Sequence, residues 1–360
     1  MSQNERQFII DYVSIYSPTH HERPAAEFLQ SRFEQWGWKA WIDAAGNACG
    51  EAGADSPRAM LCFLGHIDTV PGEIPVRVEN GVLFGRGSVD AKGPLAAFAC
   101  ALARCADQLE HLDVRLIGAV EEECSTSKGA RFAVEQYDRP DFLIIGEPSQ
   151  WNRLTLGYKG MFRFNYELRQ PRVHSAAEEF FPATKAVGFW NSIFEAHPGD
   201  AEHFASAFNQ LTGNIASMST ASEDVNELAV SMGCELRLPP GIDPEELENI
   251  LRQHADNDAA TITIREALPA VRCERSTPLV AVFNKAIRAC GGQPGFVVKT
   301  GTSDMNIAAP VWRCPTLAYG PGDSTLDHTP DEHLALDEFS QSVDVLERVL
   351  LNLDARLGNA

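Results

Sequence analysis

The stretch that most constrains this chain is residues 61–94, where potential metal ligands follow an apolar run. We expect residues 61–64 to form a buried strand, because they are apolar and a glycine bounds them. Strand side chains alternate between two faces, so His66 and Asp68 should point to one side. Asp90 follows a Gly-rich segment and precedes an Ala- and Leu-rich run, which places it at a loop-to-helix junction. The stretch therefore predicts half of a metal-centred hydrolase site.

Apolar runs alternate with helical patterns through the first part of the chain. The apolar runs lie at 61–64, 114–120 and 142–145, and the helical patterns lie at 94–103 and 129–137. This alternation predicts an α/β fold with a mainly parallel sheet and helices on both faces. In such open sheets, ligands bind beyond the carboxyl ends of the strands.

Metal-ligand or acid/base residue types follow three of these predicted strands. They are His66, the adjacent Glu122 and Glu123, and Glu147. Taken alone, any one carboxylate after a strand is more often a helix cap or a solvated charge, and a single histidine is more often structural. The set is different, because adjacent like charges repel unless a cation or a proton offsets them. We therefore expect chemistry at this edge of the sheet.

The pattern changes after residue 157. Strand, helix, strand, strand, helix and strand follow in turn, which predicts an inserted ferredoxin-like α/β lid domain at 158–271. The insert divides the catalytic metal-binding domain into a first part at 1–157 and a second part at 272–360. In the second part, His328 lies in a loop framed by Gly and Pro. Taken alone, it could equally be a neighbour of a helix cap, but it is the best partner for His66.

Composition limits the class of protein and its cellular compartment. The chain has 360 residues, of which 44% are hydrophobic and 22% are charged, as in an ordinary globular protein of about two domains. It starts without a signal-like segment, and its longest apolar stretch is shorter than the roughly 18 residues that cross a membrane. We therefore expect a cytoplasmic protein. Nine scattered cysteines without a CxxC pair predict reduced thiols rather than disulfides or a structural zinc site.

The net charge of −20 argues against nucleic acid and anionic membranes as partners, since no Lys/Arg cluster offsets the repulsion. The same charge would repel a strongly acidic protein substrate.

Eight motifs stand out along the chain: GHIDTVPG, GRGSVDAKGP, the acidic run at 121–123, IIGEPS, the HS pair at His174, RLPPG, TGTSDMN and GPGDSTLDHTPDEH. Together they resemble the zinc-dependent aminoacylase and carboxypeptidase family, which contains acetylornithine deacetylase and succinyl-diaminopimelate desuccinylase. The resemblance covers nearly the whole chain, and the last motifs look most like the acetyl-lysine or carrier-bound lysine deacylase branch. One departure is Glu121, which stands where relatives usually have Asp.

The resemblance implies a zinc-peptidase-like catalytic domain that holds two zinc ions, with cobalt as a possible substitute. Asp90 would bridge the two ions. The carboxylate of Asp68 would orient the His66 ring without binding the metal itself, and Glu122 would be the general base. Nitrogen and oxygen ligands of this kind suit zinc. The implied metal ligands are His66, Asp90, Glu123, Glu147 and His328.

The resemblance also implies substrate-binding residues and a homodimer formed through the lid domain. His174 would reach in from the partner subunit's lid and stabilise the oxyanion together with the metal. A guanidinium fork suits a substrate carboxylate, and lid closure would exclude water. The implied carboxylate-binding residues are Arg237, Asn214, Gly301, Thr302 and Ser303. Taken alone, His174 is more typical of a loop histidine, and Arg237 of a strand residue whose charge reaches solvent.

We expect a metal-dependent amidohydrolase that removes an acyl group, by preference acetyl, from the amino nitrogen of a small-molecule amino acid such as lysine, ornithine or citrulline in amino-acid biosynthesis. A lysine or ornithine hydrolase acting on an acidic amino-group carrier protein is the nearest alternative, and the net charge disfavours it. A dipeptidase or carboxypeptidase is a third possibility. A non-enzymatic binding scaffold is disfavoured, because all five implied ligands and Glu122 are present.

Overall fold

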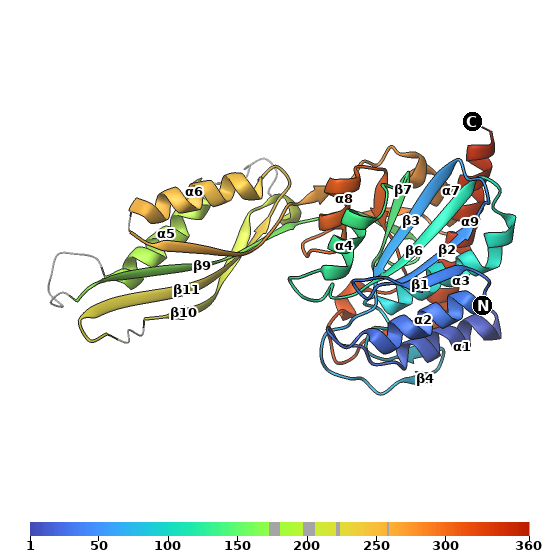
Figure 1. The fold of residues 1–360 in the computed structure, drawn as a ribbon, viewed down its shortest axis with the longest axis horizontal. Helices are drawn as coiled ribbons and strands as arrows, with labels where there is room; N and C mark the ends of the chain where they lie inside the picture. The colour runs from blue at the N-terminus through green and yellow to red at the C-terminus, as the bar shows by residue number, and fades with distance from the viewer. Residues whose placement is uncertain (173–180, 197–205, 221–223, 258, 360) are drawn as a thin grey trace. The chain divides into compact units, whose positions relative to one another are not determined.

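The computed structural model of the protein describes residues 1–172, 181–196, 206–220, 224–257 and 259–359. The chain forms two compact units (Figure 1). The large unit comprises Met1–Gly157, Cys273–Val298 and Ser303–Ala360, and the small unit comprises Tyr158–Arg272 and Lys299–Thr302. None of the helices in the described ranges is both long enough and apolar enough to cross a membrane.

Most strands of the large unit belong to one nine-stranded sheet. Its strands run in the order β1-β2-β6-β3-β7-β15-β8-β13, and β14 pairs with β8 outside this path. The strands are β1 (Lys39–Ile42), β2 (Ala48–Gly53), β3 (Ala59–His66), β6 (Leu112–Ala119), β7 (Phe142–Gly146), β8 (Arg153–Tyr158), β13 (Val271–Arg272), β14 (Gly295–Lys299) and β15 (Thr316–Ala318). A separate three-stranded sheet consists of β4 (Arg77–Glu79), β5 (Val82–Phe84) and β16 (His333–Ala335).

The middle of the large sheet is parallel. β3 pairs in parallel with β6 on one side and with β7 on the other, and β7 pairs in parallel with β15. Antiparallel strands extend the sheet at both ends, through β2 next to β6 and β8 next to β15. Nearly every residue of β3 and all of β7 are buried, as expected for strands that helices cover on both faces.

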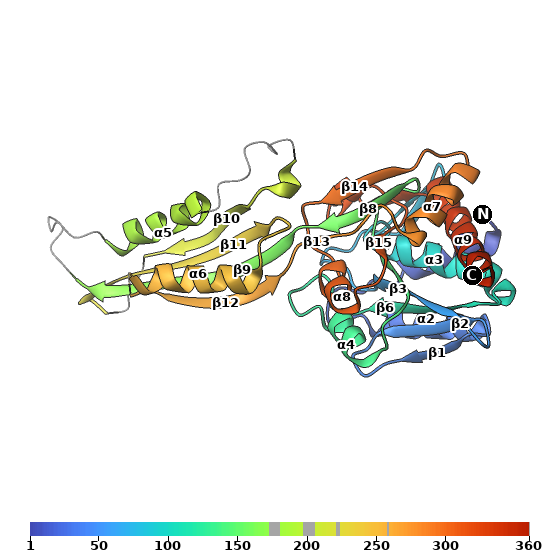
Figure 2. The same cartoon turned by 90° about the horizontal axis from the view of Figure 1, so that it is seen from above.

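Helices cover both faces of this sheet, with α3, α7 and α9 on one side and α4 and α8 on the other (Figure 2). One continuous apolar core packs side chains of α1, α2, α3, α7 and α9 against the sheet. The bounds are α1 (Gln3–Val13), α2 (Arg23–Gln35), α3 (Lys92–Cys105), α4 (Lys128–Gln136), α7 (Pro278–Ala289), α8 (Met305–Trp312) and α9 (Leu336–Gly358).

The small unit is a four-stranded antiparallel sheet with its own apolar core. The sheet order is β10-β11-β9-β12, which is the order of a ferredoxin-like βαββαβ fold. Phe189 of α5 packs against Tyr166 of β9 in this core, with ring centroids 4.7 Å apart. The elements are β9 (Gly160–Pro171), α5 (Pro182–Ala196), β10 (Thr212–Ser219), β11 (Glu227–Leu238), α6 (Pro244–Asn257) and β12 (Thr261–Leu268).

The predicted fold class is confirmed: the fold is α/β, with a mainly parallel central sheet, helices on both faces and a ferredoxin-like second unit. The sequence patterns did not indicate the antiparallel edges or the three-stranded sheet, whose strands are only three residues long. The units also differ slightly from the expected boundaries. Residues 299–302 group with the small unit, where the backbone N–H of Lys159 donates to the carbonyl of Lys299 at 3.1 Å.

Two glycines allow β3 and β7 to approach each other where both strands end. Gly65 and Gly146 are register partners, and each directly precedes a polar residue of the candidate site. A Cβ atom at Gly146 would lie 2.5 Å from the Phe63 ring and 3.1 Å from the Cα of Gly65. The Phe63 ring is itself stacked on Phe98, so it has little freedom to move away.

We predict that Gly146→Ala lowers the free energy of unfolding by about 1–3 kcal/mol, because the added methyl group overpacks this core. Gly188→Ala in α5 is the control, since its new Cβ would meet no described atom within 4 Å. That substitution should stabilise the helix by about 0.5–1 kcal/mol. Urea unfolding followed by circular dichroism measures both. Equal stability of Gly146→Ala and the wild type would contradict the close approach.

Candidate metal centre

Three parallel strands of the large unit deliver polar side chains to one edge of the sheet. His66 is the last residue of β3, Glu147 directly follows β7, and the loop after β6 carries Glu122 and Glu123. The imidazole of His66 is 1% exposed and Glu147 is 7% exposed. The edge therefore gathers ionisable groups that are largely withdrawn from water.

The carboxylate of Asp90 lies between two imidazoles. Its Oδ1 is 3.2 Å from Nε2 of His66, and its Oδ2 is 3.1 Å from Nε2 of His328. Glu147 places an oxygen 4.0 Å from the same nitrogen of His66, and Glu123 places an oxygen 3.0 Å from that of His328. One carboxylate thus joins two groups of side chains, each with one histidine and one glutamate.

Asp68 fixes this edge through its backbone and its side chain together. Nδ1–H of His66 donates to the backbone carbonyl of Asp68 at 2.9 Å, which sets the ring orientation. The carboxylate of Asp68 accepts the backbone N–H groups of Glu122 and Glu123, each at 3.0 Å, and the hydroxyl of Thr19 at 2.9 Å. The sequence predicted only that Asp68 orients His66. The structure adds that Asp68 also fixes the backbone of the loop at residues 121–123, called the glutamate loop below.

The three consecutive glutamates have different surroundings. Glu121 turns toward Thr126, whose hydroxyl donates to it at 2.6 Å, while Glu123 pairs with His328. Within the described ranges, the Glu122 carboxylate accepts no hydrogen bond. Withdrawal from water raises the pKa of Glu122 well above its ordinary value, and the nearby His66 opposes this shift. Glu122 is therefore the carboxylate of the loop that is available to exchange a proton.

Glu332 positions the backbone at Asp90. Its Oε1 accepts the N–H groups of Val89 and Asp90 at 2.9 and 3.1 Å, and its Oε2 accepts a hydrogen bond from Arg86 at 2.8 Å. Both Glu332 and Arg86 are buried, so water does not compete for these contacts. No local sequence pattern predicts this role for Glu332, although the residue lies inside the GPGDSTLDHTPDEH motif.

Asp304 is a second buried carboxylate that the sequence analysis did not single out. It is 2% exposed, and neither carboxylate oxygen has a hydrogen-bond partner among the described residues. Burial raises the pKa of Asp304 to about 7, an effect that His66 opposes and Asp68 reinforces. The only sequence signal was its place in the TGTSDMN motif.

The distances between the candidate ligand atoms suit a bound metal. His66, Asp90 and Glu123 each offer one ligand atom, and these atoms lie within 4.8 Å of one another. Two ligand atoms of a tetrahedral zinc ion lie about 3.4 Å apart, because each is about 2.1 Å from the metal. The separations of 3.0 to 3.2 Å around Asp90 and His328 are close to that value.

The tautomer of His66 gives an independent test of the fit. Nδ1 must carry a hydrogen, because its partner is a carbonyl that can only accept. In the neutral ring, Nε2 therefore presents a lone pair to the oxygens of Asp90 and Glu147, and that contact repels. A cation placed between these atoms would attract both the nitrogen lone pair and the carboxylate oxygens, so the repulsion would be replaced by attraction. Hydrogen bonding to Asp90 and, to a smaller extent, to Glu123 raises the pKa of His328 to about 10. The carboxylates therefore favour a positive charge next to both imidazoles.

The expected carboxylate-binding residues are divided between the units. Arg237 is the second-last residue of β11 in the small unit, and its guanidinium donates to the hydroxyl of Thr302 at 3.5 Å. Burial and then the nearby Arg163 lower the pKa of Arg237. Asn214 is exposed on β10 of the same unit. Gly301 also belongs to the small unit.

Ser303 belongs to the large unit and is 4% exposed. Its hydroxyl accepts the backbone N–H of Met305 at the start of α8, at 3.2 Å. His174, which we expected near the oxyanion, lies outside the described residues.

Residues 62–352 match the peptidase family M20/M25/M40. The chain belongs to this family. The match confirms the resemblance to the zinc-dependent aminoacylases and carboxypeptidases, and the chain is an M20-family hydrolase.

The full-length relatives point to one branch of the M20 family. A LysW-lysine hydrolase of Deinococcus radiodurans is 41% identical over 358 residues, with 98% of each chain covered. A LysW-lysine/LysW-ornithine hydrolase of Saccharolobus islandicus is 26% identical over 341 residues, covering 94% of this chain and 92% of the relative. These names match the lysine deacylase branch that the last motifs resemble.

Solved M20 structures share the fold over nearly the whole chain. A metallo-carboxypeptidase of Sulfolobus solfataricus superposes with a TM-score of 0.77 at 18% identity, covering 97% of this chain and 99% of the other. A Bacillus subtilis peptidase described as dinuclear metal binding gives a TM-score of 0.72 at 12% identity, with 97% of both chains covered. At these identities the likeness concerns the fold alone.

We predict that Glu332→Gln lowers the affinity for zinc by about 10- to 100-fold while the fold is kept. If the amide oxygen keeps both backbone donors, its NH2 group faces the Arg86 guanidinium and that buried hydrogen bond is lost, so the support of the backbone at Asp90 is weakened. Chelator competition measures the affinity. Glu79→Gln is the control, because it changes an exposed ion pair with Arg77. Equal affinities in the two variants would contradict a supporting role for Glu332.

Proposed function

We propose that this protein hydrolyses the amide bond that joins lysine or ornithine to an amino-group carrier protein of the LysW type, and so releases the free diamino acid. The observation that carries the amidohydrolase chemistry is the Asp90 carboxylate shared between His66 and His328, beside Glu122, whose carboxylate accepts no hydrogen bond from the described residues. The 41% identity to the LysW-lysine hydrolase over nearly the whole chain supports the choice of substrate. We place the reaction in the cytoplasm.

The residues around Asp90 would hold two divalent cations. One ion would be held by His66, Asp90 and Glu147, and the other by Asp90, Glu123 and His328. We propose zinc, because imidazole and carboxylate ligands suit it, and cobalt as a functional substitute. When bound, such ions lower the pKa of the attacking water and stabilise the negative charge that develops on the carbonyl oxygen.

Glu122 is the proposed general base. Its carboxylate is not committed to a hydrogen bond in the described part of the chain, and its raised pKa suits proton exchange near neutral pH. It would take one proton from the attacking water as the carbon–oxygen bond forms. It would then give that proton to the nitrogen of the leaving amino group as the carbon–nitrogen bond breaks. Glu122 thus ends the cycle in its starting state.

The substrate's carboxylate would bind in the small unit. We propose that Arg237 binds it through its planar guanidinium, with Asn214, Gly301 and Thr302 of the same unit as further contacts. Among the described residues, Arg237 makes a single long hydrogen bond, to Thr302, so we propose that its other donors bind the ligand. His174, supplied by the partner subunit of a homodimer formed through the lid, would stabilise the oxyanion.

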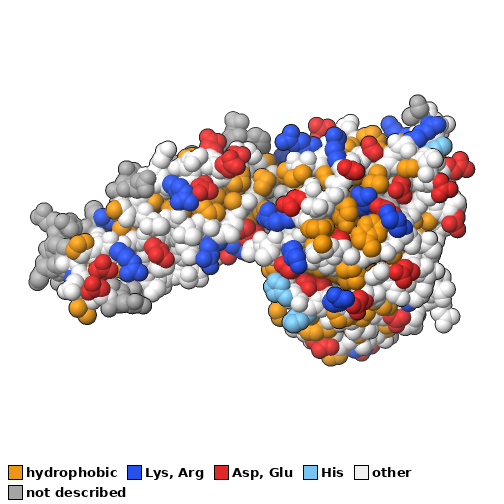
Figure 3. Space-filling model, viewed as in Figure 1, with side chains coloured by type: hydrophobic (Ala, Val, Ile, Leu, Met, Phe, Trp, Pro, Cys, Tyr) orange, Lys and Arg blue, Asp and Glu red, His pale blue; other side chains and the backbone are white. Residues whose placement is uncertain are grey.

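The relatives favour the carrier-linked substrate over a free acetylated amino acid, which reverses the order that the sequence analysis gave. That order rested on the net charge of −20, which is a property of the whole chain. Docking responds to the charges at the contact surface, and Lys and Arg side chains are spread over the visible face of both units (Figure 3). The total charge is therefore a poor argument against an acidic carrier.

We predict that Glu122→Gln lowers kcat by at least about 100-fold and leaves the metal content unchanged, because only proton transfer is lost. Glu123→Gln is the matched variant, with the same chemical change one residue away. It should instead lower the occupancy of one metal position, since Glu123 contacts His328. Elemental analysis and turnover of the purified zinc-loaded protein measure both effects. The reverse pattern would show that the two roles are exchanged.

We also predict that carrier-linked lysine is hydrolysed with a higher kcat/KM than acetyl-lysine, succinyl-lysine or glutamyl-lysine at equal zinc loading. The carrier supplies binding contacts remote from the scissile bond that small conjugates lack. Release of free lysine is the common readout. Faster hydrolysis of acetyl-lysine would restore the free acylated amino acid as the substrate. Hydrolysis of none of the four, with zinc bound, would overturn the proposed function.

A further inference from the structure

A fully buried lysine lies beside the proposed carboxylate-binding residues of the small unit. Lys159 is 0% exposed and stands between β8 and β9. Its Nζ donates to the carbonyls of Ala207 and Gln210 at 3.1 and 2.6 Å, and to the hydroxyl of Thr212 at 2.9 Å. These contacts match the three N–H donors of an ammonium group. The lysine side chain therefore holds the segment that leads into β10.

The backbone at Lys159 is fixed as well. Its N–H group donates to the carbonyl of Lys299 at 3.1 Å, at the start of the short segment 299–302 of the small unit. A Cβ atom at Gly160 would lie 2.3 Å from the carbonyl oxygen of Leu268, so the chain next to Lys159 packs directly against the end of β12. A lysine anchored in this way holds its hydrogen-bond partners in a defined position.

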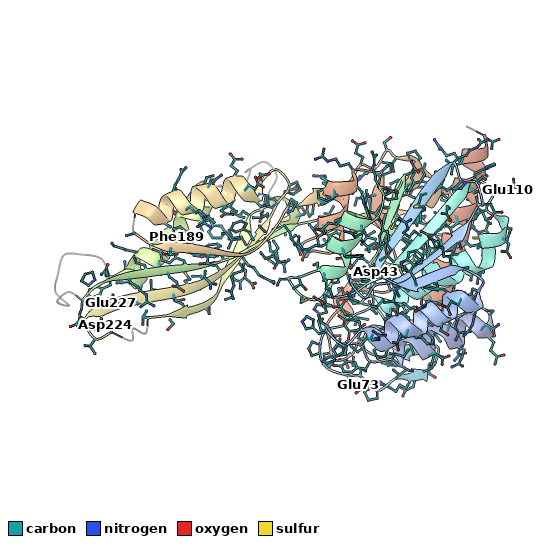
Figure 4. All side chains as sticks on the ribbon, viewed as in Figure 1. Asp43, Glu73, Glu110, Phe189, Asp224 and Glu227 are labelled. Carbon is teal, nitrogen blue, oxygen red and sulfur yellow. The ribbon has the colours of Figure 1, made fainter. Side chains whose placement is uncertain are left out.

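Arg237 and Thr212 are direct neighbours on one face of the small sheet. Glu227, labelled in Figure 4, begins β11, and Arg237 lies near the other end of that strand. There Arg237 is the register partner of Thr212 on β10. Residues directly opposite each other project from the same face, with Cβ atoms about 4.5–5.5 Å apart. Leu236 and Leu238 are buried in the apolar core, so the residue between them faces away from that core, and Thr212 does the same.

Lys159 and Arg237 bring two positive charges close together. Burial and then the nearby Arg237 lower the pKa of Lys159 to about 8, so the amine is still mainly protonated at neutral pH. Neighbouring like charges repel each other, whereas both charges would attract an anion. This end of the β10–β11 pair is therefore suited to a carboxylate.

The hydroxyl of Thr212 has a hydrogen to offer to such an anion. A lysine ammonium can only donate, so the hydroxyl oxygen is the acceptor in its contact with Lys159. The O–H group of Thr212 donates to no acceptor among the described residues, and Thr212 is exposed. Accepting a hydrogen bond from a cation also polarises the hydroxyl and makes it a stronger donor.

We propose that Thr212 is a further substrate-binding residue, which donates its hydroxyl hydrogen to the substrate's carboxylate beside the Arg237 guanidinium, and that Lys159 positions it. Lys159 touches no substrate atom. It acts by holding the Thr212 oxygen, so that the hydroxyl hydrogen points away from the ammonium and toward the ligand. The pair thereby selects conjugates of amino acids over conjugates of simple amines. This inference rests on the proposed function, because it concerns the same carboxylate.

Two ligands that differ only in the carboxylate test this role. The linking carboxyl group of the LysW-type carrier is joined either to lysine or to cadaverine, which is lysine without its carboxylate. Both conjugates are titrated into the zinc-loaded Glu122→Gln protein, whose slow turnover leaves the ligand intact. The ratio of the two Kd values measures recognition of the carboxylate. We expect the lysine conjugate to bind at least about 100-fold more tightly.

Substitutions at Thr212 and Lys159 are then added to this protein. Thr212→Val removes the hydroxyl and keeps the side-chain shape, so the ratio should fall roughly tenfold, as expected for a hydrogen bond to a charged group. Thr212→Ser is the matched control, because it keeps the hydroxyl and should keep the ratio. Lys159→Met should lower the ratio by a similar factor although the Thr212 hydroxyl is still present. The Thr212 variants serve if Lys159→Met does not fold, because Thr212 is exposed.

The double variant tests whether Lys159 acts through Thr212. Lys159→Met combined with Thr212→Val should lower the ratio no further than either substitution alone, because both remove the same interaction. Losses that multiply in the double variant would show that Lys159 does not act by positioning Thr212.

Three further results would overturn the inference. They are an unchanged ratio in Thr212→Val, equal Kd values of the two conjugates before any substitution at Thr212, and an equal weakening of both conjugates by each substitution. The last result is expected if the two residues only support the fold. Hydrolysis by the wild type is measured separately, so failure of the proposed function is distinguishable from failure of this inference.

Discussion

The Asp90 carboxylate, placed between the imidazoles of His66 and His328, organises the large unit. Two carboxylates and two histidines converge on it from segments that are far apart in the chain. Carboxylates that are close together and largely buried repel each other, so other hydrogen bonds must hold them in position. Asp68 secures the glutamate loop and Glu332 secures the backbone at Asp90, each through paired backbone hydrogen bonds.

The sequence was most informative where chemistry follows directly from strand direction. His66 and Glu147 could be placed because parallel strands end at the same edge, and the apolar runs before them are unambiguous. The fold class followed from the same alternation. Residues whose role comes from a long-range backbone contact could not be found in this way. Glu332 accepts hydrogen bonds from residues 242 and 243 positions earlier in the chain, and no local pattern records that.

Asp304 shows the same limit for a buried charge. An aspartate at the start of a helix looks like an ordinary capping residue in the sequence. Only its burial and the lack of hydrogen-bond partners for its oxygens among the described residues distinguish it. Charge was also misleading at the scale of the whole chain, since a sum over 360 residues says little about any one surface.

The insertion of the small unit has a consequence for biosynthesis. The chain leaves the large unit at Gly157 and returns to it at Cys273, and His328 follows still later. Synthesis proceeds from the N-terminus, so His66, Asp90, Glu123 and Glu147 emerge from the ribosome well before the last imidazole. A nascent chain therefore carries an incomplete acidic cluster while the whole small unit is translated. The imidazole of His328 therefore joins the cluster only at the final stage of synthesis.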